Sequence, residues 1–304
     1  MPRNISLYVL TLCTLGVWLW ACTPLAAPTT AKKLQVVGTT TQVTALAKEV
    51  GGDKIELKGL MQANIDAHRF EPTPEDVRAV TNARVVIKNG LNLEGFLEQL
   101  IRNSGTRAII VDASKGVPTR KGDEEFLGGD PHIWHSVPNA ILMLNNIRDG
   151  LTQADSTNAG TYRANAAAYE KKLLALDQYI MQQIATLPPE NRKLVSDHDT
   201  FGYYTERYGL VFVGSVIPSL NTTEQPSAQE VAGLIEKIKA EKVKAIFTEA
   251  SVNPKLARQI AQDAGVRVVD GALYGDSLGP PGSGAETLEG MLKLNTDLIV
   301  ASLK

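Results

Sequence analysis

Short apolar runs alternate with segments of helical spacing along the first half of the chain. From residue 33 onward, the runs have the length and branched character of buried strands, and helix-capping residues separate them. The predicted strands cover residues 34–37, 55–57, 85–87 and 108–111. The predicted helices run from near Thr39 to Val50, begin again at Thr73, and span residues 93–101. Strands that alternate with helices predict a parallel sheet.

The same alternation restarts in the second half of the chain. Its predicted strands cover residues 194–195, 210–213, 243–247 and 266–269, and its predicted helices cover residues 203–208, 227–239 and 254–264. Two similar α/β halves therefore follow each other. The predicted fold class is α/β with two lobes, each a parallel β-sheet flanked by helices.

One long amphipathic helix is predicted between the two halves. Its apolar positions recur every three or four residues, at Ala166, Tyr169, Leu173, Leu176, Ile180, Ile184 and Leu187. This spacing forms one stripe on a helix of about 27 residues, which Pro188 and Pro189 end. Because no glycine-rich or proline-rich break interrupts the stripe, we expect a rigid link. The expected divisions are a first lobe over residues 33–157, the linking helix over 158–189 and a second lobe over 190–304.

The N-terminus carries a targeting pattern. The apolar run from Leu7 to Ala21 is shorter than the roughly twenty residues of a membrane span and has the length of a signal-peptide core. It ends at Leu19-Trp-Ala-Cys22, which resembles the lipidation motif of bacterial lipoproteins. We therefore expect a signal peptide over residues 1–21, a lipid on Cys22 and a tether over 22–32. A plain secretory signal and an uncleaved anchor are the alternatives.

Composition narrows the class of protein. The chain has 304 residues, of which 43% are apolar and 21% charged, and a formal net charge of −2. This is ordinary globular usage for two domains, and without a basic excess we expect no nucleic-acid partner. Cleavage before Cys22 would remove Cys13 and leave one cysteine, so no disulfide is expected within the mature chain.

Three of the four histidines occupy similar positions in the predicted fold. His68, His132 and His198 follow predicted strands or lie in loops, and Asp276 follows the strand predicted at 266–269. In open α/β sheets, ligands bind outside the carboxyl ends of the strands. Three imidazoles and one carboxylate there would make a four-ligand site for a divalent metal. Position alone leaves open the alternative that these are solvated loop histidines.

Several motifs in order resemble one family along the chain from Val36 to the C-terminus. They are Asp66-Ala-His-Arg-Phe-Glu-Pro-Thr-Pro74, Asn89-Gly-Leu-Asn-Leu-Glu-Gly95, Asp130-Pro-His-Ile-Trp134, Ser196-Asp-His-Asp-Thr-Phe-Gly-Tyr203, Ile217-Pro-Ser-Leu220, Thr248-Glu-Ala-Ser-Val-Asn-Pro254 and Asp276-Ser-Leu-Gly-Pro-Pro-Gly-Ser-Gly284. The set resembles the metal-binding solute receptors of bacterial zinc and manganese ABC importers, in the helical-backbone, TroA-like class of lipoproteins.

The resemblance implies a metal site between the two lobes. His68 and His132 would be ligands from the first lobe, and His198 and Asp276 ligands from the second. In this family a glutamate at the third position tends to accompany manganese or iron, so His198 favours zinc, with manganese next. The implied protein is a monomer that captures the ion outside the cytoplasmic membrane and passes it to an ABC permease and its ATPase. It would be lipid-anchored to the cell membrane, on the periplasmic side or the outer cell surface.

Acidic residues near the motifs are candidates to orient the ligands. Glu71 could accept a hydrogen bond from His68, and Asp197 or Asp199 could support His198. Glu249 ends a predicted strand near the cleft and could support a ligand or be an alternative oxygen ligand. For Glu71, and for one of Asp197 and Asp199, a solvated surface position is the competing interpretation.

Three details of the sequence depart from a simple two-histidine motif or from the family pattern. Pro138 disfavours helical geometry at Val137, so the helix over residues 140–146 should begin after both His132 and His135. We expect His135 to be a hydrogen-bonding or exposed neighbour, not a ligand. Ala67 replaces the usual proline. No histidine-rich insert precedes His132, and the acids of residues 123–125 either attract a cation or form a solvated loop.

Two other functions remain as alternatives. A secreted zinc-dependent hydrolase needs three protein ligands, a water and a general base, and the sequence lacks a His-Glu-x-x-His signature. We therefore expect no enzyme. A surface adhesin with a structural metal is the second alternative; it should unfold on chelation. We expect the metal-free protein to stay folded, because each lobe would have its own sheet and core.

Overall fold

The computed structural model describes residue 1 and residues 33–122 and 126–304. The predicted signal peptide, Cys22, the tether up to residue 32 and the acids of residues 123–125 lie outside the described residues. Among the helices of the described ranges, none has both the length and the apolar content to cross a membrane.

The first lobe is built on a four-stranded parallel sheet in the order β2-β1-β3-β4. The strands are β1 Leu34–Gly38, β2 Ile55–Gly59, β3 Val85–Lys88 and β4 Ile109–Asp112. The helices are α1 Thr41–Gly51, α2 Pro74–Asn82, α3 Leu97–Ser104 and α4 Val137–Ala154. Helix α3 begins later than the predicted residue 93, because the segment before Leu97 forms turns, in which Leu91 and Asn92 adopt positive φ angles of 55° and 64°.

Neighbouring residues of these strands face opposite sides of the sheet. Val36 packs in the cluster that contains α1 and α4, whereas Val37 packs with residues of α2 and α3. A strand that is buried on both faces needs an unbroken apolar run instead of an alternating one. The apolar runs of the sequence therefore predicted the first-lobe strands correctly.

The second lobe contains two parallel strand pairs that lie side by side through β5 and β7. Its strands are β5 Lys193–His198, β6 Val211–Ile217, β7 Ala245–Glu249 and β8 Arg267–Leu273. Its helices are α6 Gly202–Tyr208, α7 Ala228–Ala240, α8 Lys255–Ala264 and α9 Leu288–Leu303. The two-lobe α/β class with parallel sheets flanked by helices is confirmed.

Strand β5 is longer than the predicted residues 194–195. It continues through Ser196, Asp197 and His198, all of them buried. The apolar pattern missed this extension because the three side chains are polar. The extension makes His198 the last residue of a buried strand.

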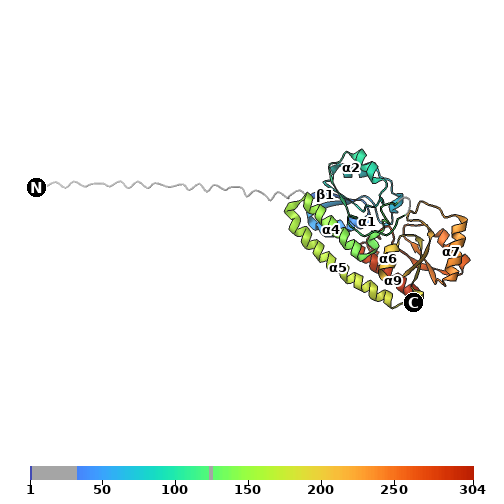
Figure 1. Cartoon of the computed structure of the whole chain (residues 1–304). Coiled ribbons are helices and arrows are strands. Elements are labelled where there is room, and N and C mark those ends of the chain that lie inside the picture. The colour runs from blue at the N-terminus through green and yellow to red at the C-terminus, as the bar shows by residue number, and fades with distance from the viewer. Residues whose placement is uncertain (2–32, 123–125) are drawn as a thin grey trace. The chain divides into compact units, whose positions relative to one another are not determined.

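Helix α5, Ala159–Ala185, has 27 residues and ends shortly before the two prolines. It packs against α4 and α1 of the first lobe and against α9 of the second, and it runs along one side of both lobes in Figure 1. Val36 of β1, Leu173 of α5 and Ile299 of α9 belong to one apolar cluster. The expectation of a separate core in each lobe is therefore wrong for the main core, which is continuous through α5. Among the described residues, two smaller clusters belong to single lobes.

Candidate metal centre

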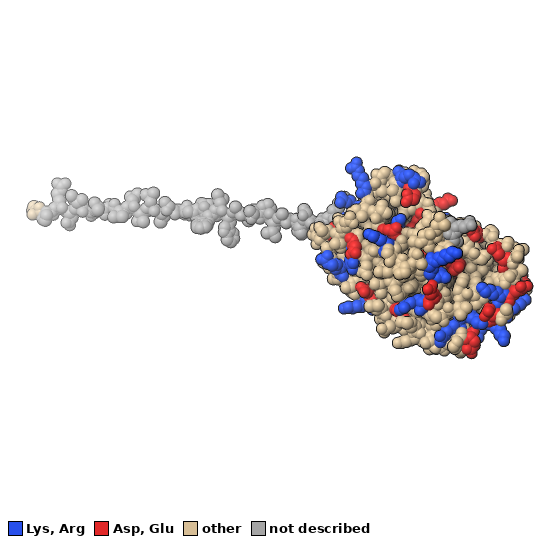
Figure 2. All heavy atoms as spheres, viewed as in Figure 1, with Lys and Arg blue, Asp and Glu red and all other residues tan. Residues whose placement is uncertain are grey.

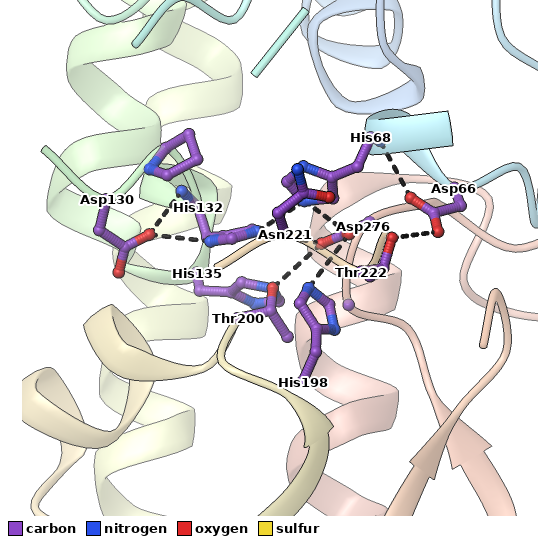
Figure 3. A network of polar contacts seen from close by, with 12 residues as sticks. Asp66, His68, Asp130, His132, His135, His198, Thr200, Asn221, Thr222 and Asp276 are labelled. Atoms are coloured by element: carbon purple, nitrogen blue, oxygen red, sulfur yellow. Dashed lines mark hydrogen bonds and ion pairs between the residues drawn. The ribbon is translucent and has the colours of Figure 1, made fainter. Parts of the chain in front are cut away.

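Four side chains from separate segments converge between the lobes (Figure 3). His68 lies in the short 3-10 helix Ala67–Arg69, and His132 precedes another, Ile133–His135. From the second lobe, His198 ends β5, and Asp276 follows the end of β8 at Leu273. The structure thus brings together the four residues that the sequence singled out as ligands, with one candidate ligand atom of each within 4.8 Å of the others.

Four of the separations between nitrogen and oxygen atoms of these residues have the size expected of a tetrahedral metal shell. The Nε2 atoms of His68 and His132 lie 3.3 Å apart. Asp276 Oδ2 lies 3.2 Å from His68 Nε2 and 3.2 Å from His198 Nε2, and Asp276 Oδ1 lies 3.4 Å from His132 Nε2. Zinc–ligand bonds of about 2.0–2.1 Å imply ligand atoms roughly 3.3 Å apart in a tetrahedron. One small cation at the centre could therefore contact all four residues.

Burial and missing partners also favour an ion at this point. The four side chains are at most 1% exposed. His198 Nε2 and Asp276 Oδ2 have no hydrogen-bond partner among the described residues, although they lie close together. Buried polar atoms without partners are costly, and a shared cation would satisfy both.

Asp130 orients the His132 ring. Its Oδ1 accepts hydrogen bonds from His132 Nδ1 at 2.8 Å and from the His132 backbone N–H at 2.9 Å. Because a carboxylate only accepts, the hydrogen sits on Nδ1 and the Nε2 lone pair faces the centre. Burial raises the pKa of Asp130, but the hydrogen bonds of His132 and the charge of Arg120 lower it below its ordinary value.

Glu249 has the same role for the His198 ring. Glu249, the last residue of β7, accepts hydrogen bonds through Oε1 from His198 Nδ1 at 2.8 Å and from the His198 backbone N–H at 3.1 Å. Asp197 does not contact the ring: its Oδ2 accepts from the Glu249 backbone N–H at 2.7 Å. Asp197 therefore supports His198 through Glu249. Asp199 is half-buried, not fully solvated.

His68 is held differently from the prediction. Glu71, the proposed acceptor, is exposed. The acid beside His68 is Asp66, whose Oδ1 accepts from the His68 backbone N–H at 2.9 Å and whose Oδ2 accepts from Thr222 Oγ1 at 2.5 Å. Thr222 belongs to the second lobe, so this carboxylate also links the two lobes (Figure 3).

His135 lies close to the centre but is not part of it. Its Nε2 is 3.3 Å from Thr200 Oγ1, and Thr200 donates to Asp276 Oδ1 at 3.2 Å. The predicted hydrogen bond is thus present, whereas the alternative of solvent exposure is wrong, because His135 is fully buried. Burial, followed by the charge of His132, lowers the pKa of His135 to about 3. As predicted, α4 begins after both histidines, but the expectation that Pro138 keeps Val137 out of the helix is wrong. Val137 is the first helical residue, because Pro138 lies in the first turn, where a missing N–H is tolerated.

The centre favours positive charge. Burial alone would raise the pKa of Asp276, but the charges of His198, His132 and His68 hold it well below its ordinary value. Burial would lower the pKa of His198, but Asp276 and Glu249 raise it well above its ordinary value. The buried negative charges of Asp276 and Glu249 thus favour a positive charge at this point, which a divalent cation would supply.

Three residues that form hydrogen bonds to the proposed ligands were not predicted from the sequence. Asp66 and Asp130 each precede a histidine ligand by two residues, so the repeated Asp-x-His spacing was the signal for them. Thr200 touches Asp276 across 76 positions of sequence, and no local pattern could have found it.

Residues 36–302 match the family described as zinc-uptake complex component A, periplasmic. A metal ABC transporter substrate-binding lipoprotein, SsaB of Streptococcus sanguinis, is 30% identical over 308 residues, which cover 98% of this chain and 97% of the relative. The manganese-binding lipoprotein MntA of Bacillus subtilis is 30% identical over 281 residues, with 90% of each chain covered.

A solved structure shows the same fold. The periplasmic zinc binding protein TroA from Treponema pallidum superposes with a TM-score of 0.84 and 28% identity, over 90% of this chain and 99% of that one. The likeness covers both lobes and the linking helix, so the two proteins share the two-lobe α/β architecture.

Proposed function

The chain belongs to the zinc-uptake complex component A family, and from this membership we propose how it handles its metal. It is an extracytoplasmic metal-binding solute receptor that delivers a divalent ion to an ABC importer. We propose that His68, His132, His198 and Asp276 bind the ion between the lobes. The observation that carries this is the convergence of these four buried side chains, with one candidate ligand atom of each within 4.8 Å of the others.

Four protein ligands favour carriage of the ion over catalysis. A catalytic zinc keeps a coordination position for water or substrate, whereas four protein ligands fill a tetrahedral shell. The buried position of the centre adds to this, because a substrate could not reach the ion without separation of the lobes.

Zinc is the ion that we propose first, with manganese next. Three nitrogen ligands and one carboxylate suit zinc better than manganese, which prefers oxygen. The similar proteins carry both metals in their names: manganese for MntA and zinc for TroA. Because zinc binds most N/O sites more tightly than manganese, affinity alone does not identify the transported ion; uptake by cells that carry the importer does.

The anchor and the partners complete the proposal. We propose that Cys22 carries a lipid that holds the receptor at the cell membrane, which is supported by the description of SsaB and MntA as lipoproteins. The partners would be the permease and its ATPase. A monomer suffices, because one chain supplies all four ligands.

Single substitutions at the two neighbouring histidines test the site. His132→Ala removes a ligand and should weaken zinc binding by at least a hundredfold, whereas His135→Ala should change it less than threefold. Titration calorimetry with a competing chelator measures both, and the same variants should differ in the same order in uptake assays with labelled zinc or manganese. Strong loss in His135→Ala with little loss in His132→Ala would sink the assignment.

A further inference from the structure

Arg120 binds one carboxylate from each lobe beside the metal centre. It lies in the loop that follows β4. Its Nη1 donates to Asp130 Oδ2 at 2.8 Å, and its Nε donates to Glu206 Oε2 at 3.1 Å. The Asp130 side chain is fully buried in the first lobe, whereas Glu206 is exposed on α6 of the second. One guanidinium therefore spans the boundary between the lobes.

The backbone around Arg120 strengthens this connection. The backbone N–H of Arg120 donates to the Tyr203 hydroxyl at 2.9 Å, and that hydroxyl donates to the Asp130 carbonyl at 2.8 Å. Tyr203 lies on α6, which begins only four residues after His198. Helix α6, which follows the second-lobe ligand His198, is thus hydrogen-bonded to the segment that leads to the first-lobe ligand His132.

Gly202 leaves room for the guanidinium. A Cβ atom at this position would lie 1.5 Å from Arg120 Nη1, far closer than any real contact. A side chain at position 202 would push Nη1 away from its site on Asp130. The glycine at the start of α6 is therefore a second, independent part of the same contact.

Arg120 reaches the metal centre through Asp130. One oxygen of Asp130 accepts from the His132 ring and the other accepts from Arg120. A guanidinium fixes a carboxylate in orientation as well as in charge. If the lobes separated, Arg120 would have to release either Asp130 or Glu206, and the support of His132 would change.

We propose that Arg120 is a positioning residue that ties the orientation of the His132 imidazole to the closed arrangement of the two lobes, and that it thereby slows release of the bound metal. This role rests on the proposed function as a metal receptor. It adds a link between lobe closure and ligand geometry that the four ligands do not provide by themselves.

Metal release from the full chain tests the role. Arg120→Gln and Gly202→Ala should each speed the loss of zinc to an excess of chelator by tenfold to a hundredfold, with little change in the association rate. Both should also alter the visible spectrum of bound Co²⁺, which reports ligand geometry. Glu206→Gln should have a smaller effect of about threefold, because exposed pairs are weak.

Two controls make the outcome decisive. Arg148→Gln removes an arginine of matched exposure, 28% against 32% for Arg120, that pairs with Asp149 on the surface of α4; it should release zinc at the wild-type rate. In an Asp130→Asn background, Arg120→Gln should add little, because the two residues act in series.

Wild-type release rates in both Arg120→Gln and Gly202→Ala, with normal zinc binding, would overturn the inference and leave the proposed function intact. Full additivity with Asp130→Asn would also overturn it. Failure of the wild-type chain to bind zinc would instead contradict the proposed function. Thermal unfolding of the metal-free variants identifies any loss of folding, and Glu206→Gln, a surface change, keeps the test available in that case.

Discussion

The two lobes support their metal ligands in different ways. In the first lobe, His68 lies in a short 3-10 helix and His132 directly precedes another, and each has an aspartate two residues earlier that accepts from its backbone N–H. In the second lobe, His198 ends a buried strand, and its acceptor, Glu249, ends a neighbouring strand 51 residues away. Support is local on one side of the centre and depends on the sheet on the other.

This difference indicates what each half of the centre requires. A short Asp-x-His segment can turn back on its own backbone, so the first-lobe loops carry part of their order within the motif. The His198 ring takes its orientation from Glu249, which in turn is held by Asp197. The orientation of His198 therefore depends on β5 and β7 lying side by side.

The largest effect should come from the support that depends on the sheet. Glu249→Gln keeps the shape of the side chain but removes the negative charge of the carboxylate that accepts hydrogen bonds from the His198 ring and backbone. Zinc affinity should therefore fall roughly 10–100-fold. Titration calorimetry measures the change. Glu241→Gln, which removes an exposed acid paired with Lys193, is the matched control and should bind zinc normally. Equal affinities of the two variants would show that the sheet-dependent support is dispensable.

The same contrast explains which parts of the site were predictable. The ligands themselves and the first-lobe acids belong to short motifs, and Asp-x-His spacing is visible in the sequence. Glu249 was a candidate only because it ends a predicted strand. Its hydrogen bonds to His198 depend on which strands lie side by side. The hydrophobic pattern along the chain does not specify the order of strands in a sheet. Glu71 was misplaced because proximity in sequence does not fix the direction of a side chain.

The fold was predictable for a related reason. Buried parallel strands and the long stripe of α5 leave apolar signals that survive without any knowledge of packing. Strand β5 was underestimated because its last three residues are polar and buried for the site. The shared core was missed because one apolar cluster contains residues from opposite ends of the chain, such as Val36 and Ile299. The hydrophobic pattern did not predict the end of β5, because the residues there are polar although they are buried.

A second prediction separates the two neighbouring histidines by pH. In the native chain, burial and the charge of His132 lower the pKa of His135 to about 3, whereas the unfolded side chain titrates near 6.5. Below pH 6.5 the unfolded state binds a proton that the native state does not. The stability contributed by neutral His135 is therefore complete above pH 6.5 and is lost as pH falls toward 3.

Substitution isolates this contribution. Relative to His135→Gln, the metal-free wild type should lose about 2 kcal/mol of unfolding free energy between pH 7 and pH 5. Urea denaturation in the presence of chelator at the two pH values measures the difference. A constant difference between the two proteins would mean that His135 titrates alike in the folded and unfolded states, and its interior position would then have no electrostatic consequence.

The smallest effect should come from loss of the hydrogen bond that links Asp66, the support of His68 in the first lobe, to Thr222 of the second lobe. Thr222→Val preserves the side-chain shape but removes the hydrogen bond from Oγ1 to Asp66 Oδ2. Asp66 keeps its bond to the His68 backbone, so the local motif survives and only its attachment to the second lobe is lost. Zinc affinity should fall about fivefold, equivalent to about 1 kcal/mol.

Thr223→Val, at the exposed neighbouring position, should bind zinc as the wild type does. If Thr222→Val weakened binding as much as Glu249→Gln does, the first-lobe support would depend on the other lobe as strongly as His198 depends on its sheet, and the contrast between the two halves of the centre would disappear.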